Sequence, residues 1–69
     1  MRDMTGAELR TRRERADLRQ WQLAIEMRVA SSRISQIESL ARVPDVAADR
    51  YLAALRAAQD RAMSPKDAA

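Results

Sequence analysis

Apolar residues return along this chain every three or four positions, which is the spacing of amphipathic helices. Thr5 and Glu8 form a capping box at the start of the first such stretch. Pro44, followed by the good N-cap residue Asp45, separates the last stretch from the others. The pattern predicts helices over residues 6–16, 20–27, 31–39 and 46–62. We therefore expect an all-α fold, with one compact domain over residues 1–63 and a flexible tail over residues 64–69.

Composition supports helices and limits the stability that one copy can reach. The chain has 69 residues, and a core of that size rarely supplies more than about 3–5 kcal/mol. Its commonest apolar residue is alanine, a strong helix former, and its only aromatic residues are Trp21 and Tyr51. The absence of Cys and His excludes disulfides and the usual zinc sites. Oligomerisation is the remaining common source of stability, so we expect a homodimer.

No group of residues typical of catalysis stands out. The chain lacks a catalytic Cys or His, a glycine-rich phosphate loop and a carboxylate cluster. We therefore predict that it is not an enzyme and that it binds no cofactor and no metal. It also lacks the run of about 20 apolar residues that a membrane span needs and the apolar stretch of a signal peptide. These features predict a cytoplasmic protein with no membrane partner.

The formal net charge of +3 permits binding to nucleic acid without requiring it. Nearly all the basic residues are arginines, whose planar fork of donors suits phosphate and guanine. Ten acidic residues are interleaved with the thirteen basic ones, however, and that mixture is equally typical of a solvated helical surface. Charge alone leaves both interpretations open.

The two middle helices have the arrangement of a helix-turn-helix, in which short helices are joined by a turn of a few residues. The second of them has an apolar face with Ile34 and Ile37. Its opposite face carries small or polar side chains, namely Ser32, Ser35, Gln36 and Ser39. A helix that enters the major groove of DNA needs such a polar outer face. The small Ala24 suits the close crossing of the two helices.

The stretch over residues 18–38 reads LRQWQLAIEMRVASSRISQIE. Its characteristic positions are Gln20, Leu23, Ala24, Val29, Ser32, Ile34, Ser35, Ile37 and Glu38. This pattern resembles the Cro/C1-type repressors, also called the xenobiotic-response-element family, and the similarity extends over residues 5–57. The resemblance implies a lambda-repressor-like bundle of four or five helices. It also implies a transcriptional regulator, bacterial or phage-encoded and associated with the nucleoid when bound. Such a regulator binds double-stranded DNA at an inverted-repeat operator as a dimer.

The resemblance assigns three groups of residues. Ser31, Ser32 and Gln36 match positions that read base edges, and we expect the neighbouring Arg33 to read bases as well. Gln20 and Arg42 match positions that contact the DNA backbone, and we expect further backbone contacts from Arg19, Arg28, Ser35 and Ser39. Arg13 and Glu38 match a structural ion pair that locks the first helix to the recognition helix. Because arginine prefers guanine and glutamine prefers adenine, Arg33 and Gln36 are expected to set specificity; the alternative is that Arg33 only grips phosphate.

The sequence departs from the family where glycine or a capping hydroxyl is usual. Arg28 replaces the glycine of the turn, and a left-handed backbone there would cost about 1–2 kcal/mol. Asp17 replaces the glycine between the first two helices and tolerates that conformation better. Leu40 replaces the glycine after the recognition helix. Arg19 and Ala30 stand at N-cap positions where Ser or Thr is usual, and a missing cap costs about 1 kcal/mol.

Two sets of apolar residues each have two interpretations. Trp21 and Ile25 lie one helical turn apart at positions that are usually polar in the family. They are either covered by another part of this chain or form a surface for a partner. Tyr51, Leu52 and Leu55 are either core residues or part of a twofold interface. The alternative to a DNA-binding regulator is therefore a protein-binding module on the same fold, such as an antiactivator or antitoxin, that uses Trp21 and Ile25.

Overall fold

The computed structural model describes residues 4–63, and this part of the chain is all-helical, with four helices and no strand. The helices are α1 (Gly6–Arg15), α2 (Gln20–Met27), α3 (Ser31–Glu38) and α4 (Asp45–Met63). Each predicted helix agrees with the observed one to within one residue at both ends. The described residues contain no fifth helix, and the predicted tail lies outside them. None of the described helices combines the length and the apolar character needed to cross a membrane.

The helix starts follow the local sequence. The Thr5 hydroxyl accepts the backbone N–H of Glu8 at 3.0 Å and caps α1. Only this half of the expected capping box forms, because the Glu8 carboxylate pairs with Arg12. At the start of α2 the Arg19 side chain has no acceptor, so only the reverse half of a capping box forms, from the Arg19 backbone N–H to Gln22 Oε1 at 2.7 Å. Ala30 starts α3 with no side-chain cap. Asp45, expected to be an N-cap, is instead the first residue of α4, where its charge favours the helix dipole.

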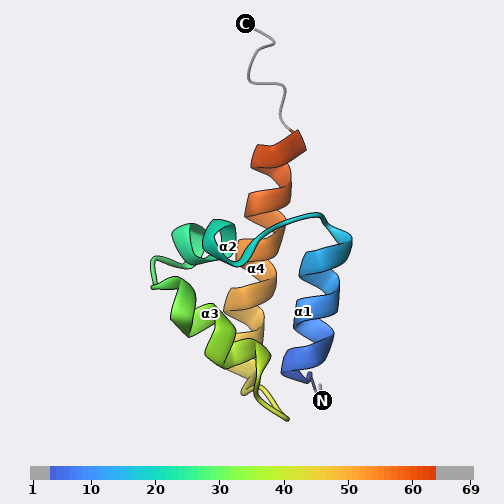
Figure 1. Cartoon of the computed structure of the whole chain (residues 1–69), viewed down its shortest axis with the longest axis vertical. Coiled ribbons are helices and arrows are strands. Elements are labelled where there is room, and N and C mark those ends of the chain that lie inside the picture. The colour runs from blue at the N-terminus through green and yellow to red at the C-terminus, as the bar shows by residue number, and fades with distance from the viewer. Residues whose placement is uncertain (1–3, 64–69) are drawn as a thin grey trace, which may run out of the picture.

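The helices pack in a compact arrangement around α4. Figure 1 shows α4 running beside α1 and crossed by α2, with its last turns projecting beyond the other helices. Its neighbours α1 and α2 pack directly on it, and α3 packs against α1 and α2. The largest fully buried side chains come from every helix and from the loop before α4: Leu9, Leu23, Ile34, Ile37, Val43 and Tyr51. The α2–turn–α3 unit thus rests on a core that all four helices share.

Tyr51 and Leu55 belong to this core, which is the first of the two interpretations of their stripe. The Tyr51 side chain is 0% exposed and Leu55 is also buried. Leu52 is partly buried and packs against the same cluster. The physical reason is the thin apolar face of α1, whose Leu9 needs cover from α4; the Tyr51 hydroxyl lies 3.3 Å from the Leu9 carbonyl oxygen.

Within residues 4–63, two non-glycine residues have left-handed backbones, at the two connections where the resembling family has glycine. Asp17 has a φ of 60°, and Arg28 has a φ of 59° and a ψ of 46°. The left-handed Arg28 lets two backbone bonds close α2, from Arg28 N–H to Ile25 O at 3.2 Å and from Val29 N–H to Ala24 O at 3.0 Å. This reversal is what sets α3 at an angle to α2 within so short a turn.

We expect Arg28→Gly to raise the free energy of unfolding by about 1 kcal/mol, because glycine has no Cβ to penalise a positive φ. Asp17→Gly is the matched control at an almost identical φ. Its gain should be smaller, since aspartate tolerates this region better than arginine. Urea titration followed by circular dichroism measures both. A loss of stability in Arg28→Gly would show that the arginine side chain stabilises the fold by more than its backbone strain costs.

The single glycine of the chain stands where α1 meets the end of α3. A Cβ added at Gly6 would come within 2.4 Å of the carbonyl oxygens of Ile37 and Glu38. The Gly6 N–H also donates to the Leu40 carbonyl oxygen at 2.9 Å. The missing side chain therefore allows the first turn of α1 to touch the backbone at the end of α3.

Gly6→Ala should lower the free energy of unfolding by about 1–3 kcal/mol, as overpacking does elsewhere, although alanine is the better helix former. The clash is with backbone atoms, so no rotamer change relieves it. The neighbouring exposed Ala7 supplies the control: Ala7→Gly should cost only the helix-propensity difference, about 1 kcal/mol. Equilibrium urea unfolding compares the three proteins, and a more stable Gly6→Ala variant would refute the close approach.

Candidate nucleic-acid interface

The outer face of α3 is polar and has no acidic side chain. Ile34 and Ile37 point into the core. The exposed residues from this helix and its C-cap are Ser31, Ser32, Arg33, Ser35, Gln36 and Ser39. Glu38 is the only acidic residue of α3, and it is buried, with 8% of its surface exposed. The face that the sequence assigns to DNA is therefore free of the charge that phosphates would repel.

Burial of Glu38 is made tolerable by donors from the three other helices. Arg13 of α1 makes two hydrogen bonds to its carboxylate, from Nε to Oε2 at 2.7 Å and from Nη2 to Oε1 at 3.2 Å. The Tyr51 hydroxyl of α4 donates to Oε2 at 2.5 Å, and Gln20 Nε2 of α2 donates to Oε1 at 3.1 Å. Arg13 Nη1 also donates to the Leu18 carbonyl oxygen at 2.8 Å. The expected contact between Arg13 and Glu38 is thus present, as part of a larger network.

The network keeps Glu38 ionised. Burial opposes its charge, but the hydrogen bonds from Arg13, Tyr51 and Gln20 outweigh that cost and hold its pKa below the usual value. The hydrogen bond to Glu38 raises the pKa of Arg13 despite burial. Burial, together with the neighbouring carboxylate, raises the pKa of Tyr51, so its hydroxyl remains a donor. At neutral pH the centre of the bundle therefore holds a charged pair with a neutral phenol.

Tyr51→Phe keeps the ring and removes one donor from the carboxylate. We expect it to lower the free energy of unfolding at pH 7 by about 1.5–3 kcal/mol, the range for a hydrogen bond to a charged group. A depressed folded pKa contributes stability above the unfolded pKa of about 4.3 that is lost as pH falls through the folded value. The difference between the two proteins should therefore shrink as pH falls below the unfolded pKa and through the lowered folded one. Urea titrations at a series of pH values between 7 and 3 test this prediction. If the difference in the free energy of unfolding does not change with pH, the Tyr51 hydroxyl does not act through the ionised carboxylate of Glu38.

The proposed base-reading side chains contact one another on the exposed face. Arg33 Nη1 donates to Gln36 Oε1 at 3.3 Å, so both long side chains lie on the same side of α3. The bond uses the amide oxygen of Gln36 and leaves its NH₂ group directed elsewhere. Ser31 and Ser32 lie in the first turn of α3 and are exposed. The structure therefore brings Arg33 and Gln36 together, whereas Ser31 lines a hollow beside Arg19 and Gln20.

The residues expected to contact the DNA backbone fall into two groups. Gln20 is half-buried, because its amide is tied to Glu38 at the start of α2. The Ser39 hydroxyl donates its hydrogen bond to the Gln36 carbonyl oxygen at 2.8 Å, so in this conformation it does not donate to a phosphate. The other four are exposed around α2, α3 and the loop to α4: Arg19, Arg28, Ser35 and Arg42.

Sequence reasoning missed Arg10 as a member of this surface. A hollow between α1 and the starts of α2 and α3 is lined by Arg10, Arg13, Arg19, Gln20, Trp21 and Ser31. Arg10 also pairs with Glu14 at 3.0 Å. It lies three residues before Arg13, so helical spacing would have placed the two arginines on one face of α1. The hollow brings three arginines to the uncapped starts of both helices.

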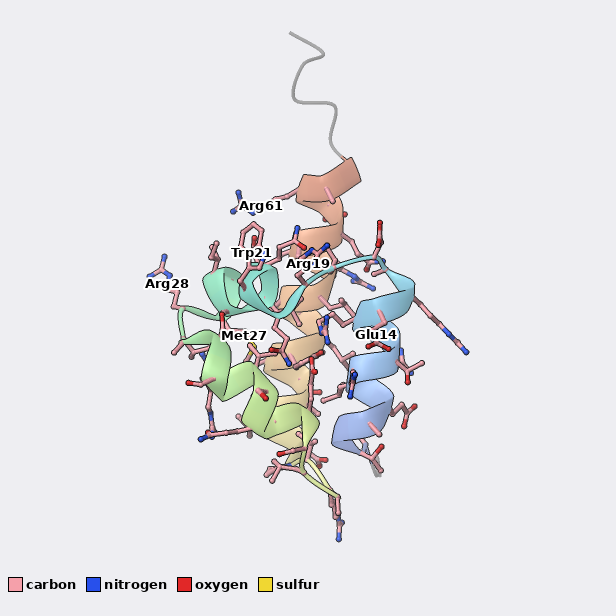
Figure 2. The ribbon with its side chains drawn as sticks, in the orientation of Figure 1. Glu14, Arg19, Trp21, Met27, Arg28 and Arg61 are labelled. Carbon is pink, nitrogen blue, oxygen red and sulfur yellow. The ribbon has the colours of Figure 1, made fainter. Side chains whose placement is uncertain are left out.

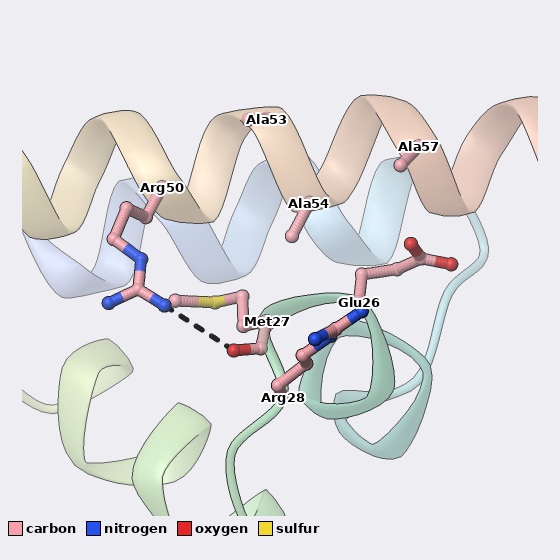
Figure 3. Close-up of a pocket in the computed structure, with 7 residues that line it drawn as sticks. All are labelled: Glu26, Met27, Arg28, Arg50, Ala53, Ala54 and Ala57. Carbon is pink, nitrogen blue, oxygen red and sulfur yellow. Dashed lines mark hydrogen bonds between the residues drawn. The ribbon is translucent and has the colours of Figure 1, made fainter.

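Arg50 was also overlooked. Figure 3 shows a pocket between the end of α2 and α4, where the small Ala53, Ala54 and Ala57 leave room beside Arg28. Arg50 Nη2 donates to the Met27 carbonyl oxygen at 3.4 Å and so helps to satisfy the last turn of α2. This contact ties the turn between α2 and α3 to α4.

Trp21 and Ile25 are not covered by the described part of the chain. They are 54% and 63% exposed, respectively. Figure 2 shows Trp21 extending from α2 near Arg61 of α4. Of the two interpretations, the one in which another described segment buries them is wrong.

No protein-family model, curated protein or solved structure matches this chain. Its function has to be inferred from the geometry of α2, α3 and the residues around them.

Proposed function

We propose that this protein is a sequence-specific, double-stranded DNA-binding transcriptional regulator of the Cro/C1 type, with α2 and α3 as its helix-turn-helix. The observation that carries the proposal is the exposed face of α3. This face is polar throughout, and it has no negative charge because the one carboxylate of the helix is buried. A protein-binding helix would instead present apolar anchors on that face. Arg19, which forms no ion pair with a carboxylate within residues 4–63, supplies positive charge beside the start of α2 that attracts phosphates.

Specificity in this proposal comes from Arg33 and Gln36. The Gln36 amide oxygen has two lone pairs, so it can accept from Arg33 and from the N6 amino group of adenine together. Its free NH₂ group then reaches adenine N7, while the remaining donors of Arg33 suit guanine. The serines on the same face are short and allow the helix to approach the bases closely. Each good bidentate pair would discriminate by about 1–3 kcal/mol.

The active form in this proposal is a homodimer. A chain of this size has a small core, and symmetric association is the common remedy where disulfides and zinc sites are excluded. Two copies would present their α3 helices to half-sites about 34 Å apart, one turn of DNA. The operator is then an inverted repeat.

The test is selection of bound duplexes from a random-sequence pool, repeated with the best sequence at two salt concentrations. We expect an inverted repeat to be enriched, with affinity that falls steeply as salt rises. Sedimentation of the protein–DNA complex gives the number of chains bound. Failure to enrich any sequence, with only weak salt-sensitive binding, would refute the proposal.

Arg33→Ala should relax the sequence preference at one guanine of each half-site by about 1–3 kcal/mol. Arg56→Ala is the matched control, since it removes the same charge from an exposed position on α4. It should change affinity slightly and equally for all sequences. Competition binding with operators mutated at single positions measures both. If Arg33→Ala weakens every sequence to the same extent, Arg33 grips phosphate and does not read a base.

A further inference from the structure

The outer face of α2 carries an exposed apolar pair outside the core, of which Trp21 also lines the hollow beside Arg19. Trp21 and Ile25 are four residues apart, so one helical turn brings them together. Figure 2 shows the Trp21 ring directed away from α3 and towards the last turns of α4. Ala58 and Ala62 of those turns line the same groove as Trp21 and Ile25. The groove therefore lies between α2 and the projecting end of α4. The large, exposed side chains of Trp21 and Ile25 form one wall, and the small side chains of Ala58 and Ala62 form the other.

The lining of this groove has no net charge, and positive charge stands at the two ends of α2. Its one carboxylate, Glu26, is neutralised across the groove by Arg61, with Nε and Oε2 at 2.5 Å. Arg19 and Arg28 stand at the two ends of α2, and both are exposed. Neither forms an ion pair with a carboxylate within residues 4–63. We call Trp21, Ile25, Ala58 and Ala62, with the flanking Arg19 and Arg28, the α2 groove.

This combination of apolar and positive groups selects among occupants. A second copy of the chain would bring like charges together at the rim, which costs affinity. DNA would satisfy the arginines but offers no apolar surface to Trp21 and Ile25. A helical segment with apolar side chains between carboxylates satisfies both, by laying its apolar face in the groove and its acidic groups against the arginines. We propose that the α2 groove binds an acidic amphipathic helix of a partner protein, in addition to the base contacts proposed for α3, and that the carboxylates of this helix and the phosphates of DNA compete for Arg19 and Arg28.

The groove carries its own reporter, because Trp21 is the only tryptophan of the chain. Its ring is half-exposed in the free protein, and an apolar partner that covers it would shift its fluorescence emission to shorter wavelength. Binding at this surface is therefore visible without any label and without DNA.

The experiment is a selection of displayed peptides of about 16 residues, long enough for an isolated helix to form, on the full chain without DNA. Enriched peptides should carry apolar residues at helical spacing flanked by Asp or Glu. A synthetic copy should shift the Trp21 emission. Ile25→Glu should weaken that peptide about tenfold or more, because it puts a charge in the apolar contact and opposes the peptide's carboxylates. Val46→Glu is the matched control, an exposed apolar residue outside the groove, and should bind as the unchanged protein does.

Circular dichroism of both variants establishes that they fold, and Ile25→Ser replaces Ile25→Glu if that variant does not. The proposal is overturned if no peptide is enriched, if basic peptides are enriched instead, or if Ile25→Glu binds unchanged. It is also overturned if the free protein sediments as a dimer that Ile25→Glu converts to a monomer, since a second copy then fills the groove. The selection contains no DNA, so its result is independent of the proposed regulator function.

Discussion

The buried carboxylate of Glu38 is the interaction on which the rest of this small bundle depends. It is the last residue of α3, and it accepts hydrogen bonds from α1, α2 and α4 through Arg13, Gln20 and Tyr51. An ion removed from water costs several kcal/mol, and only complete pairing offsets that cost. The network therefore adds less net stability than its number of bonds suggests. What it adds is a fixed position of α3 relative to every other helix, since loss of one donor leaves a buried charge unsatisfied.

The same network links the interior to the surface. Burial of Glu38 leaves the exposed face of α3 without negative charge, which makes the proposed contact with DNA electrostatically favourable. Gln20 begins α2 and holds Glu38 with one amide N–H, so a residue on the surface that faces phosphate in the proposal is positioned by the core. Gly6 contributes from the other side, by letting α1 touch the backbone at the end of α3. The contacts that hold the core together therefore also set the positions of α2 and α3 at the candidate site.

The helices were predictable from the sequence because their signals are local. Apolar spacing, the Thr5 cap and Pro44 fix their bounds to within one residue. The left-handed backbones of Asp17 and Arg28 were expected only where a family resemblance marks glycine positions. The contacts of Tyr51 and Gln20 with Glu38 were not foreseen, because they join residues that lie far apart in the chain. Periodicity placed Tyr51 and Leu55 on a stripe of α4 but could not say whether another helix or another copy covers that stripe.

The weak points of the fold lie together around the proposed DNA-binding unit. α1 begins with a capping hydroxyl, whereas α2 and α3 begin at Arg19 and Ala30 without one, each omission costing about 1 kcal/mol. Arg28 adds backbone strain of about 1–2 kcal/mol in the turn between them. The core of so small a domain supplies only a few kcal/mol, so missing caps and backbone strain are costly to it. Such costs are tolerated where the unbonded backbone groups or the strained residue serve a function. Uncapped helix starts leave backbone N–H groups free for an anion, and an arginine in the turn adds positive charge beside them. The placement of these costs in α2, the turn and α3, and not in α1, is what a phosphate-binding surface would require.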